Sequence, residues 1–287
     1  MSNETSKTSV TRLIPPIAII ALLIMIASAI FHVATMTPPA APAFDRSNAP
    51  TAPDYSEELS WFSRPTGERP AGWDTPWGID IVWFVDRPEA FMGGWNIPLD
   101  WAAVSATYEN DRWLTSESDD LFDVFAPKRR FLSSLTGHEV DIEDAMALEQ
   151  EDMLASVDFY LSEDNHMRGM FLGGSGDGVA AAYEAFQLRL DATLPYNTLF
   201  GGFIVIDQPA DEPTPLNDMP PCSSDSIYPC VLDLSAVSDN ERLTAVDALM
   251  TDFSDYLVEN VPKPAAPLPP FETIELSPIN RPEHELE

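Results

Sequence analysis

A serine set among glycines and followed by an aspartate is the part of this sequence whose residue types suggest chemistry. An apolar run leads into Gly173-Gly174-Ser175-Gly176-Asp177-Gly178, and a helix-prone run of small residues follows. This order predicts a strand, a sharp turn and a buried helix. In serine hydrolases such a turn, with the pattern G-x-S-x-G, holds the nucleophile above the sheet in a strained backbone conformation.

Two registers of that pattern fit the segment. With Ser175 at the apex, the pattern spans 173–177 and its second glycine is replaced by Asp177. With Gly176 at the apex, the pattern spans 174–178 and both flanking glycines are present, but the serine position is itself a glycine. The second register is sterically better, because glycine enters the strained backbone region freely. The sequence therefore predicts an elbow in which Gly174, Gly176, Asp177 and Gly178 shape the turn and the nucleophile is missing or displaced.

A serine nucleophile also needs a base and an acid that orients the base. The only histidine after the turn is His284, close to the C-terminus, whereas His138 and His166 precede the turn. Ser175 and His284 are thus the candidate catalytic residues, with Asp233, Asp247 or Asp252 as the acid. A glycine-rich turn without chemistry is the plain alternative. A phosphate-binding loop is not supported, because neither G-x-G-x-x-G nor a P-loop lysine is present.

The composition excludes some classes of partner. The chain has 47 acidic and 15 basic residues, for a net charge of −32. Such a surface repels nucleic-acid phosphates, so we expect no nucleic-acid binding. Two cysteines and four histidines offer little material for a metal site, and we expect no metal and no cofactor. The general explanation of this acidity is solubility. The more specific explanation is a basic partner or a divalent cation.

The N-terminal region predicts an export and anchoring segment. Residues 13–34 are almost wholly apolar and about as long as a membrane-spanning helix requires. Lys7 and Arg12 precede the run, so residues 1–12 should stay in the cytoplasm and the body should lie outside a bacterial inner membrane, in the periplasm or beyond. The alternative is a signal peptide cleaved after Ala29. Residues 35–60 are rich in proline and alanine, which predicts a linker.

Residues 61–261 predict an α/β domain with a mostly parallel sheet flanked by helices. Buried strands are expected over 78–85, 121–127, 169–174 and 199–207. Amphipathic helices are expected over 141–161 and after the capping box Ser238-Asp239-Asn240-Glu241. The basic cluster Lys128-Arg129-Arg130 should pair with nearby carboxylates. Cys222 and Cys230 lie in one loop and should form a disulfide in an exported protein. Residues 262–287 predict a proline-rich, acidic tail.

Several stretches in order resemble an uncharacterised bacterial family of α/β-hydrolase-like proteins, a domain of unknown function. They are 80–86, 95–100, 125–130, the turn at 174–178 and the cysteine loop through Leu232. The resemblance covers about residues 60–235 and implies an α/β-hydrolase-like fold. The family's serine falls on Gly176, and its histidine after the first strand is either replaced by Asp86 or displaced. Residues 277–280 could begin a further strand, in which case the sheet is truncated at its C-terminal end.

We therefore expect a membrane-anchored, exported α/β-hydrolase-like domain that has lost catalysis and serves as a binding or scaffold module, a pseudoenzyme. Its partner could be a protein or a small apolar ligand. The alternative is an active serine esterase or lipase that uses Ser175.

Overall fold

The computed structural model describes residues 25, 42–67, 69, 71–73, 76–88, 91, 93–115, 122–135, 137–191, 196–208, 215–223 and 228–263. The chain divides into two compact units, residues 1–42 and 43–287. The expected membrane anchor, apart from Met25, lies outside the described residues, as do residues 264–287 with the expected strand at 277–280. Within the described part of the chain, no helix has both the length and the apolar character needed to span a membrane.

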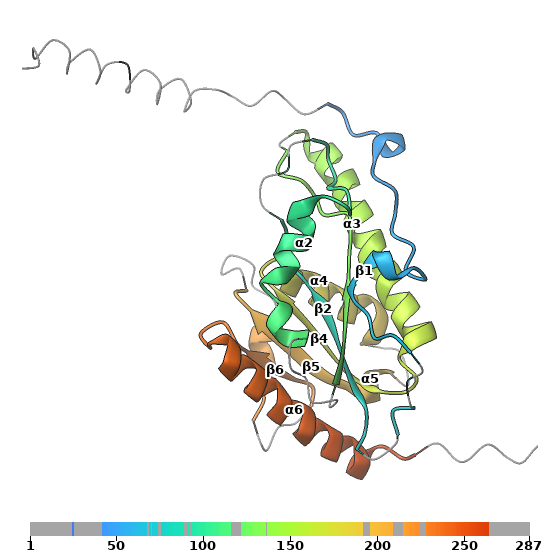
Figure 1. Ribbon diagram of the computed structural model, residues 1–287, viewed down its shortest axis with the longest axis vertical. Coiled ribbons are helices and arrows are strands. Elements are labelled where there is room, and N and C mark those ends of the chain that lie inside the picture. The colour runs from blue at the N-terminus through green and yellow to red at the C-terminus, as the bar shows by residue number, and fades with distance from the viewer. Residues whose placement is uncertain are drawn as a thin grey trace, which may run out of the picture. The chain divides into compact units, whose positions relative to one another are not determined.

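A six-stranded mixed sheet organises the second unit, and the α/β class expected from the sequence is confirmed (Figure 1). Its strands in spatial order are β1 (Trp61–Ser63), β3 (Phe122–Pro127), β2 (Ile79–Phe84), β4 (Gly169–Ser175), β5 (Phe200–Ile206) and β6 (Cys230–Asp233). β1 pairs antiparallel with β3, and all other neighbours are parallel. The chain order changes direction at β2, because β3 lies on one side of it and β4 on the other.

Helices cover both faces of this sheet (Figure 1). Their bounds are α2 Ala102–Glu109, α3 Glu139–Phe159, α4 Gly178–Ala185, α5 Tyr196–Leu199 and α6 Asp239–Asn260, with π-helical turns at Tyr160–Asp164 and Phe186–Leu190. One buried cluster joins the sheet to α2 and α6, and the other joins it to α3 and α4. α6 begins with the expected capping box of Ser238 and Glu241.

The alternation of side chains along β2 explains why a mostly apolar run forms this inner strand of the sheet. Ile81 and Trp83 belong to the cluster under α6, whereas Val82 and Phe84 belong to the cluster under α3 and α4. All six residues of β2 are buried. A strand covered on both faces is apolar at successive positions, which is the pattern of a parallel sheet. Asp80 is the exception in β2, and its buried carboxylate pairs with Arg69 and Arg168.

The expected linker at 35–60 differs from the structure over residues 43–60, which pack on the domain. Tyr55 is buried and its hydroxyl donates to the carbonyl oxygen of Lys128. The backbone N–H of Phe44 donates to Asp141, and Arg130 donates to the carbonyl oxygen of Pro50. Proline-rich composition predicted an extended segment but could not show that tertiary contacts hold it, so the domain begins near residue 43 and not at 61.

The basic cluster that follows β3 pairs with carboxylates of α3, as expected. Arg129 Nε lies 2.9 Å from Glu149 Oε1, and Arg130 Nη2 lies 2.6 Å from Asp152 Oδ1. Lys128 instead donates to the carbonyl oxygen of Leu59. These ion pairs fix α3 against the carboxyl end of β3. The structure also joins Cys222 and Cys230 in a disulfide beside β6.

Candidate functional site

The turn between β4 and α4 has Gly176 at its apex. β4 ends at Ser175, α4 begins at Gly178, and Gly176 has a φ of +52°. A Cβ atom on Gly176 would lie 2.3 Å from the Cγ of Asp86. Both the backbone conformation and the neighbouring carboxylate therefore require glycine at this position.

The two flanking glycines lie where strand and helix backbones nearly touch. A Cβ atom on Gly178 would lie 1.9 Å from the carbonyl oxygen of Phe84, and one on Gly174 would lie 2.5 Å from the carbonyl carbon of Gly178. Neither position has room for a side chain. The structure thus has the steric features expected of the register with Gly176 at its apex.

The carboxylate of Asp86, directly after β2, lies against this turn. Its Oδ1 accepts the backbone N–H of Arg87 at 2.8 Å and that of Asp177 at 2.9 Å. Two backbone donors that converge on one negatively charged oxygen form the arrangement that stabilises an oxyanion in acyl-transfer enzymes. Here the oxygen they hold belongs to the protein itself.

The Ser175 side chain points away from the apex, toward the loop that follows α2. Its Oγ donates to Asp111 Oδ2 at 2.7 Å and accepts the backbone N–H of Asp86 at 3.1 Å. Only 9% of Ser175 is exposed. Asp111 Oδ2 also accepts the indole N–H of Trp83 at 2.9 Å. The serine hydroxyl is thus held between two aspartates of different loops.

Burial dominates the electrostatics of Asp111, which is 4% exposed. Loss of solvation raises the pKa of its carboxyl group above the ordinary value, although the hydrogen bonds from Trp83 and Ser175 lower it. The negative charge of Asp86 raises this pKa further, and the positive charge of Arg242 lowers it. Asp111 therefore accepts a proton more readily than a solvated aspartate.

These groups line one cavity of about 380 Å³ at the carboxyl ends of the strands. Its polar lining includes Asp86, Asp111, Ser175, Asp207, Arg242 and Thr107. The cavity lies beside β2 and β4, between which the strand order reverses, and this is where ligands bind in open α/β sheets.

The other sequence-predicted site residues do not join Ser175. His138 precedes α3 as its N-cap, and His166 lies before the start of β4, at the other end of that strand. Asp233 accepts the backbone N–H and the hydroxyl of Ser235. Asp247 and Asp252 lie on α6, and none of these three aspartates lines the cavity. His284 lies outside the described residues.

Sequence reasoning missed both aspartates that hold the serine. Asp86 could have been identified as a candidate, because it directly follows a buried strand of a parallel sheet. Asp111 lies 64 residues before Ser175 in a polar segment and carried no signal. Within the described ranges, no group of three or more His, Cys, Asp and Glu side chains could hold a metal ion.

Comparison of the chain with protein-family models and with curated proteins gives no match.

Proposed function

We propose that this chain is a membrane-anchored, exported domain of the α/β-hydrolase-like type that has lost serine-hydrolase chemistry and works as a binding or scaffold module. The observation that carries the proposal is the position of the Asp86 carboxylate. It occupies the space that a side chain at the apex of the turn would need, and it accepts the N–H groups of Arg87 and Asp177.

The loss of chemistry follows from the need of acyl transfer for free donors that bind the oxyanion. A nucleophile elbow binds the oxyanion through the N–H of the residue after the nucleophile and an N–H from a neighbouring loop. The N–H groups of Asp177 and Arg87 are the counterparts here, and both already donate to a carboxylate. A substrate oxyanion would have to displace Asp86, and its negative charge would be repelled by that carboxylate.

Ser175 supports the second candidate, a serine esterase. Its hydroxyl donates to a carboxylate that is buried and has a raised pKa, so Asp111 is the group among the described residues that is placed to take its proton. The side chain is nevertheless buried, and its oxygen also accepts the N–H of Asp86. This arrangement holds the hydroxyl in place and leaves it poorly exposed to a substrate.

The anchoring part of the proposal comes from the sequence. The apolar run at 13–34 and the basic residues Lys7 and Arg12 before it support an uncleaved anchor with the domain on the outer side. N-terminal sequencing of the mature protein tests this part. A chain that begins at Ile30 would instead show a cleaved signal peptide.

A broad fluorophosphonate probe tests the loss of catalysis. The purified full chain should remain unlabelled and should hydrolyse short-chain p-nitrophenyl esters no faster than buffer. Asp111→Asn is a useful companion, because it removes the carboxylate that accepts the hydroxyl of Ser175 among the described residues. Stoichiometric labelling that both Ser175→Ala and Asp111→Asn abolish would overturn the proposal in favour of the esterase.

A further inference from the structure

A second cavity lies between α3 and α4, on the other side of the turn from the cavity described above. Its volume is about 610 Å³, within the range of ligand pockets. Apolar side chains line part of it: Leu132, Met146, Ala147, Ala180 and Ala181. Met146 is 50% exposed, an unusual position for a large apolar side chain. We call this cavity the α3–α4 groove.

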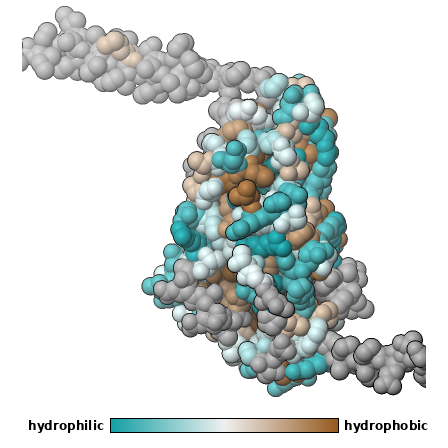
Figure 2. Space-filling view, turned by 45° about the vertical axis from the view of Figure 1, so that its right-hand side comes forward, coloured by the Kyte–Doolittle hydropathy of each residue, from teal (hydrophilic) through white to brown (hydrophobic). Residues whose placement is uncertain are grey.

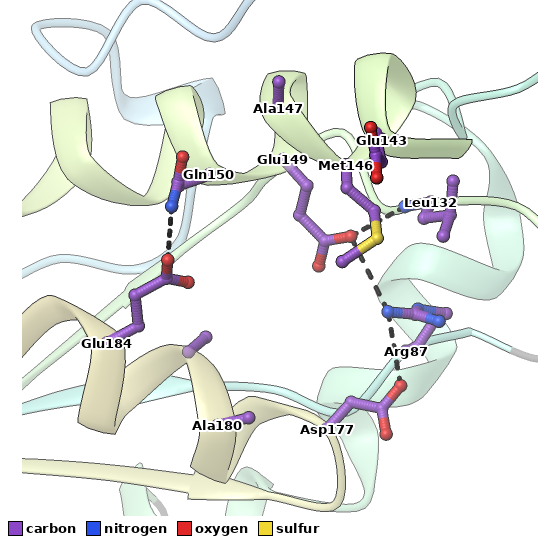
Figure 3. Close-up of a pocket in the computed structure, with 11 residues that line it drawn as sticks. Arg87, Leu132, Glu143, Met146, Ala147, Glu149, Gln150, Asp177, Ala180 and Glu184 are labelled. Carbon is purple, nitrogen blue, oxygen red and sulfur yellow. Dashed lines mark hydrogen bonds and ion pairs between the residues drawn. The ribbon is translucent and has the colours of Figure 1, made fainter. Parts of the chain in front are cut away.

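Carboxylates surround the apolar part of the groove (Figure 3). Glu143 and Glu149 come from α3, Asp177 from the turn and Glu184 from α4. Among the described residues, Arg87 is the single basic side chain that lines the groove. Its guanidinium lies 3.4 Å from Asp177 and 3.8 Å from Glu149, so it neutralises only one end of the groove.

Two carboxylates on facing walls have no cationic partner among the described residues. Glu184 accepts a hydrogen bond from the neutral amide of Gln150. The Glu143 side chain is exposed, and its carboxylate makes no hydrogen bond or ion pair with any other described residue. Glu149, in contrast, is paired with the buried Arg129. The groove therefore combines an apolar floor with two negative charges that the described part of the protein does not balance.

The surroundings of the groove limit the kind of partner that fits. The face of the molecule seen in Figure 2 has apolar residues in small patches among hydrophilic ones. The lining of the groove, with its apolar side chains among carboxylates, favours a partner that offers a short apolar contact flanked by positive charge. The wall from Glu143 to Gln150 spans about 10 Å at 1.5 Å per residue, which is about two helical turns.

We propose that the α3–α4 groove docks a basic amphipathic helix of a partner protein. Apolar residues on one face of that helix would cover Met146 and the alanines, and flanking Lys or Arg residues would meet Glu143 and Glu184. Alanines on the groove side permit the close backbone approach that helix packing requires. The partner must be basic, because its positive charge would complement the carboxylates of Glu143 and Glu184. This inference rests on the proposed function as a binding module.

Fluorescence anisotropy with the purified full chain tests the proposal. The probe is a fluorescein-labelled Leu/Lys peptide of about 18 residues, long enough to form a helix, with its leucines on one face. A scrambled peptide of the same composition and a Leu/Glu peptide are the controls. We expect the Leu/Lys peptide to bind and the Leu/Glu peptide not to bind. Binding should weaken roughly tenfold as NaCl rises from about 0.05 M to about 0.5 M.

Charge reversal locates the binding site. Glu143→Lys combined with Glu184→Lys should weaken peptide binding roughly tenfold or more. The matched control is Asp255→Lys combined with Glu259→Lys, which makes the same change in net charge on exposed positions of α6, across the sheet from the groove. This control should retain most of the affinity. Ala181→Gln adds bulk to the groove without a change in charge and should also weaken binding.

Three outcomes would overturn the proposal: no binding of the Leu/Lys peptide, equal binding of the scrambled peptide, or equal loss in the groove and control variants. The last would mean that the overall charge alone attracts the peptide. Thermal unfolding of every variant checks that it is folded. Fluorophosphonate labelling of the same preparation tests the loss of catalysis separately, so an active Ser175 would contradict the proposed function without deciding the docking.

Discussion

Buried aspartates at the two ends of the parallel sheet are neutralised in different ways. At the amino end, the carboxylate of Asp80 is contacted by the guanidiniums of Arg69 and Arg168 and by the hydroxyl of Tyr160. At the carboxyl end, the hydrogen bonds that the Asp111 carboxylate accepts from described residues come from uncharged groups, those of Trp83 and Ser175. Both are nearly or fully buried.

The difference separates a structural cluster from a candidate site. The amino-end cluster joins three segments of chain, and Arg168 also contacts Asp123 and the carbonyl oxygen of Ile79. At the carboxyl end, Asp111 and Asp86 face a cavity of about 380 Å³. Arg87 and Arg242 also line this cavity, but neither aspartate forms an ion pair with a basic side chain among the described residues. Uncompensated charge beside a cavity is typical of function, and fully paired charge is typical of architecture.

The largest expected effect comes from the amino end. Arg168→Met leaves Asp80 and Asp123 without one of their cations, so we expect the free energy of unfolding to fall by about 3–5 kcal/mol. Urea unfolding measures it. Arg112→Met is the control, because its ion pair with Glu109 is mostly exposed and should contribute less than about 1 kcal/mol. Equal losses of unfolding free energy in the two variants would contradict the structural role of the amino-end cluster.

The second effect tests the position of the Asp86 carboxylate. Gly176→Ala forces a Cβ atom against Asp86 and should destabilise the protein by about 1–3 kcal/mol more than backbone strain alone. In an Asp86→Ala background this additional cost should vanish, which gives a coupling energy of at least about 1 kcal/mol. Formate should stabilise Asp86→Ala, since it can accept the N–H groups of Arg87 and Asp177.

Gly67→Ala is the matched control for that cycle. Gly67 also has a positive φ, but a Cβ atom there would meet nothing within 4 Å. Its cost should therefore be the same with and without Asp86. Additive behaviour of Gly176→Ala and Asp86→Ala would mean that the carboxylate does not occupy the space at the apex.

The sequence predicted those parts of the fold that local patterns encode. The β-branched and aromatic run at 78–85, interrupted only by Asp80, predicted the central strand. The glycine spacing at 174–178 predicted the tight turn, because both constraints act within a few residues. β1 and β6 were missed, since Trp61–Ser63 and Cys230–Asp233 are short and only partly buried. Their place depends on neighbours distant in sequence.

The candidate site was only half predictable for the same reason. Ser175 and Gly176 lie in one recognisable segment, whereas their partners come from the loops after β2 and α2. Asp111 reaches Ser175 only because α2 crosses the carboxyl end of the sheet, and the segment around Asp111 has no pattern of its own. The packing of residues 43–60 on the domain could not be predicted either, because a proline-rich composition gives no information on tertiary contacts.

The smallest expected effect is the pH dependence of stability that comes from Asp111, at the carboxyl end of the sheet. Burial raises the pKa of Asp111 above its value of 3.8 in the unfolded chain, so the folded state holds this proton to a higher pH. The contribution of Asp111 to stability is then complete below about pH 3.8 and is lost as the pH rises through the folded-state pKa. Asp111→Asn cannot titrate, so the unfolding free energy of the wild type minus that of the variant should decrease from pH 4 to pH 7.

Urea unfolding at several pH values within that range measures this difference. Groups common to both proteins cancel, including Asp80, whose pKa burial raises to about 6. Asp255→Asn, an exposed carboxyl on α6, sets the baseline for loss of one charge. A difference for Asp111→Asn that stays constant with pH, or rises with it, would mean that the hydrogen bonds from Trp83 and Ser175 compensate the loss of solvation at Asp111 in full. A falling difference would place the uncompensated charge at Asp111, beside Ser175 and the cavity.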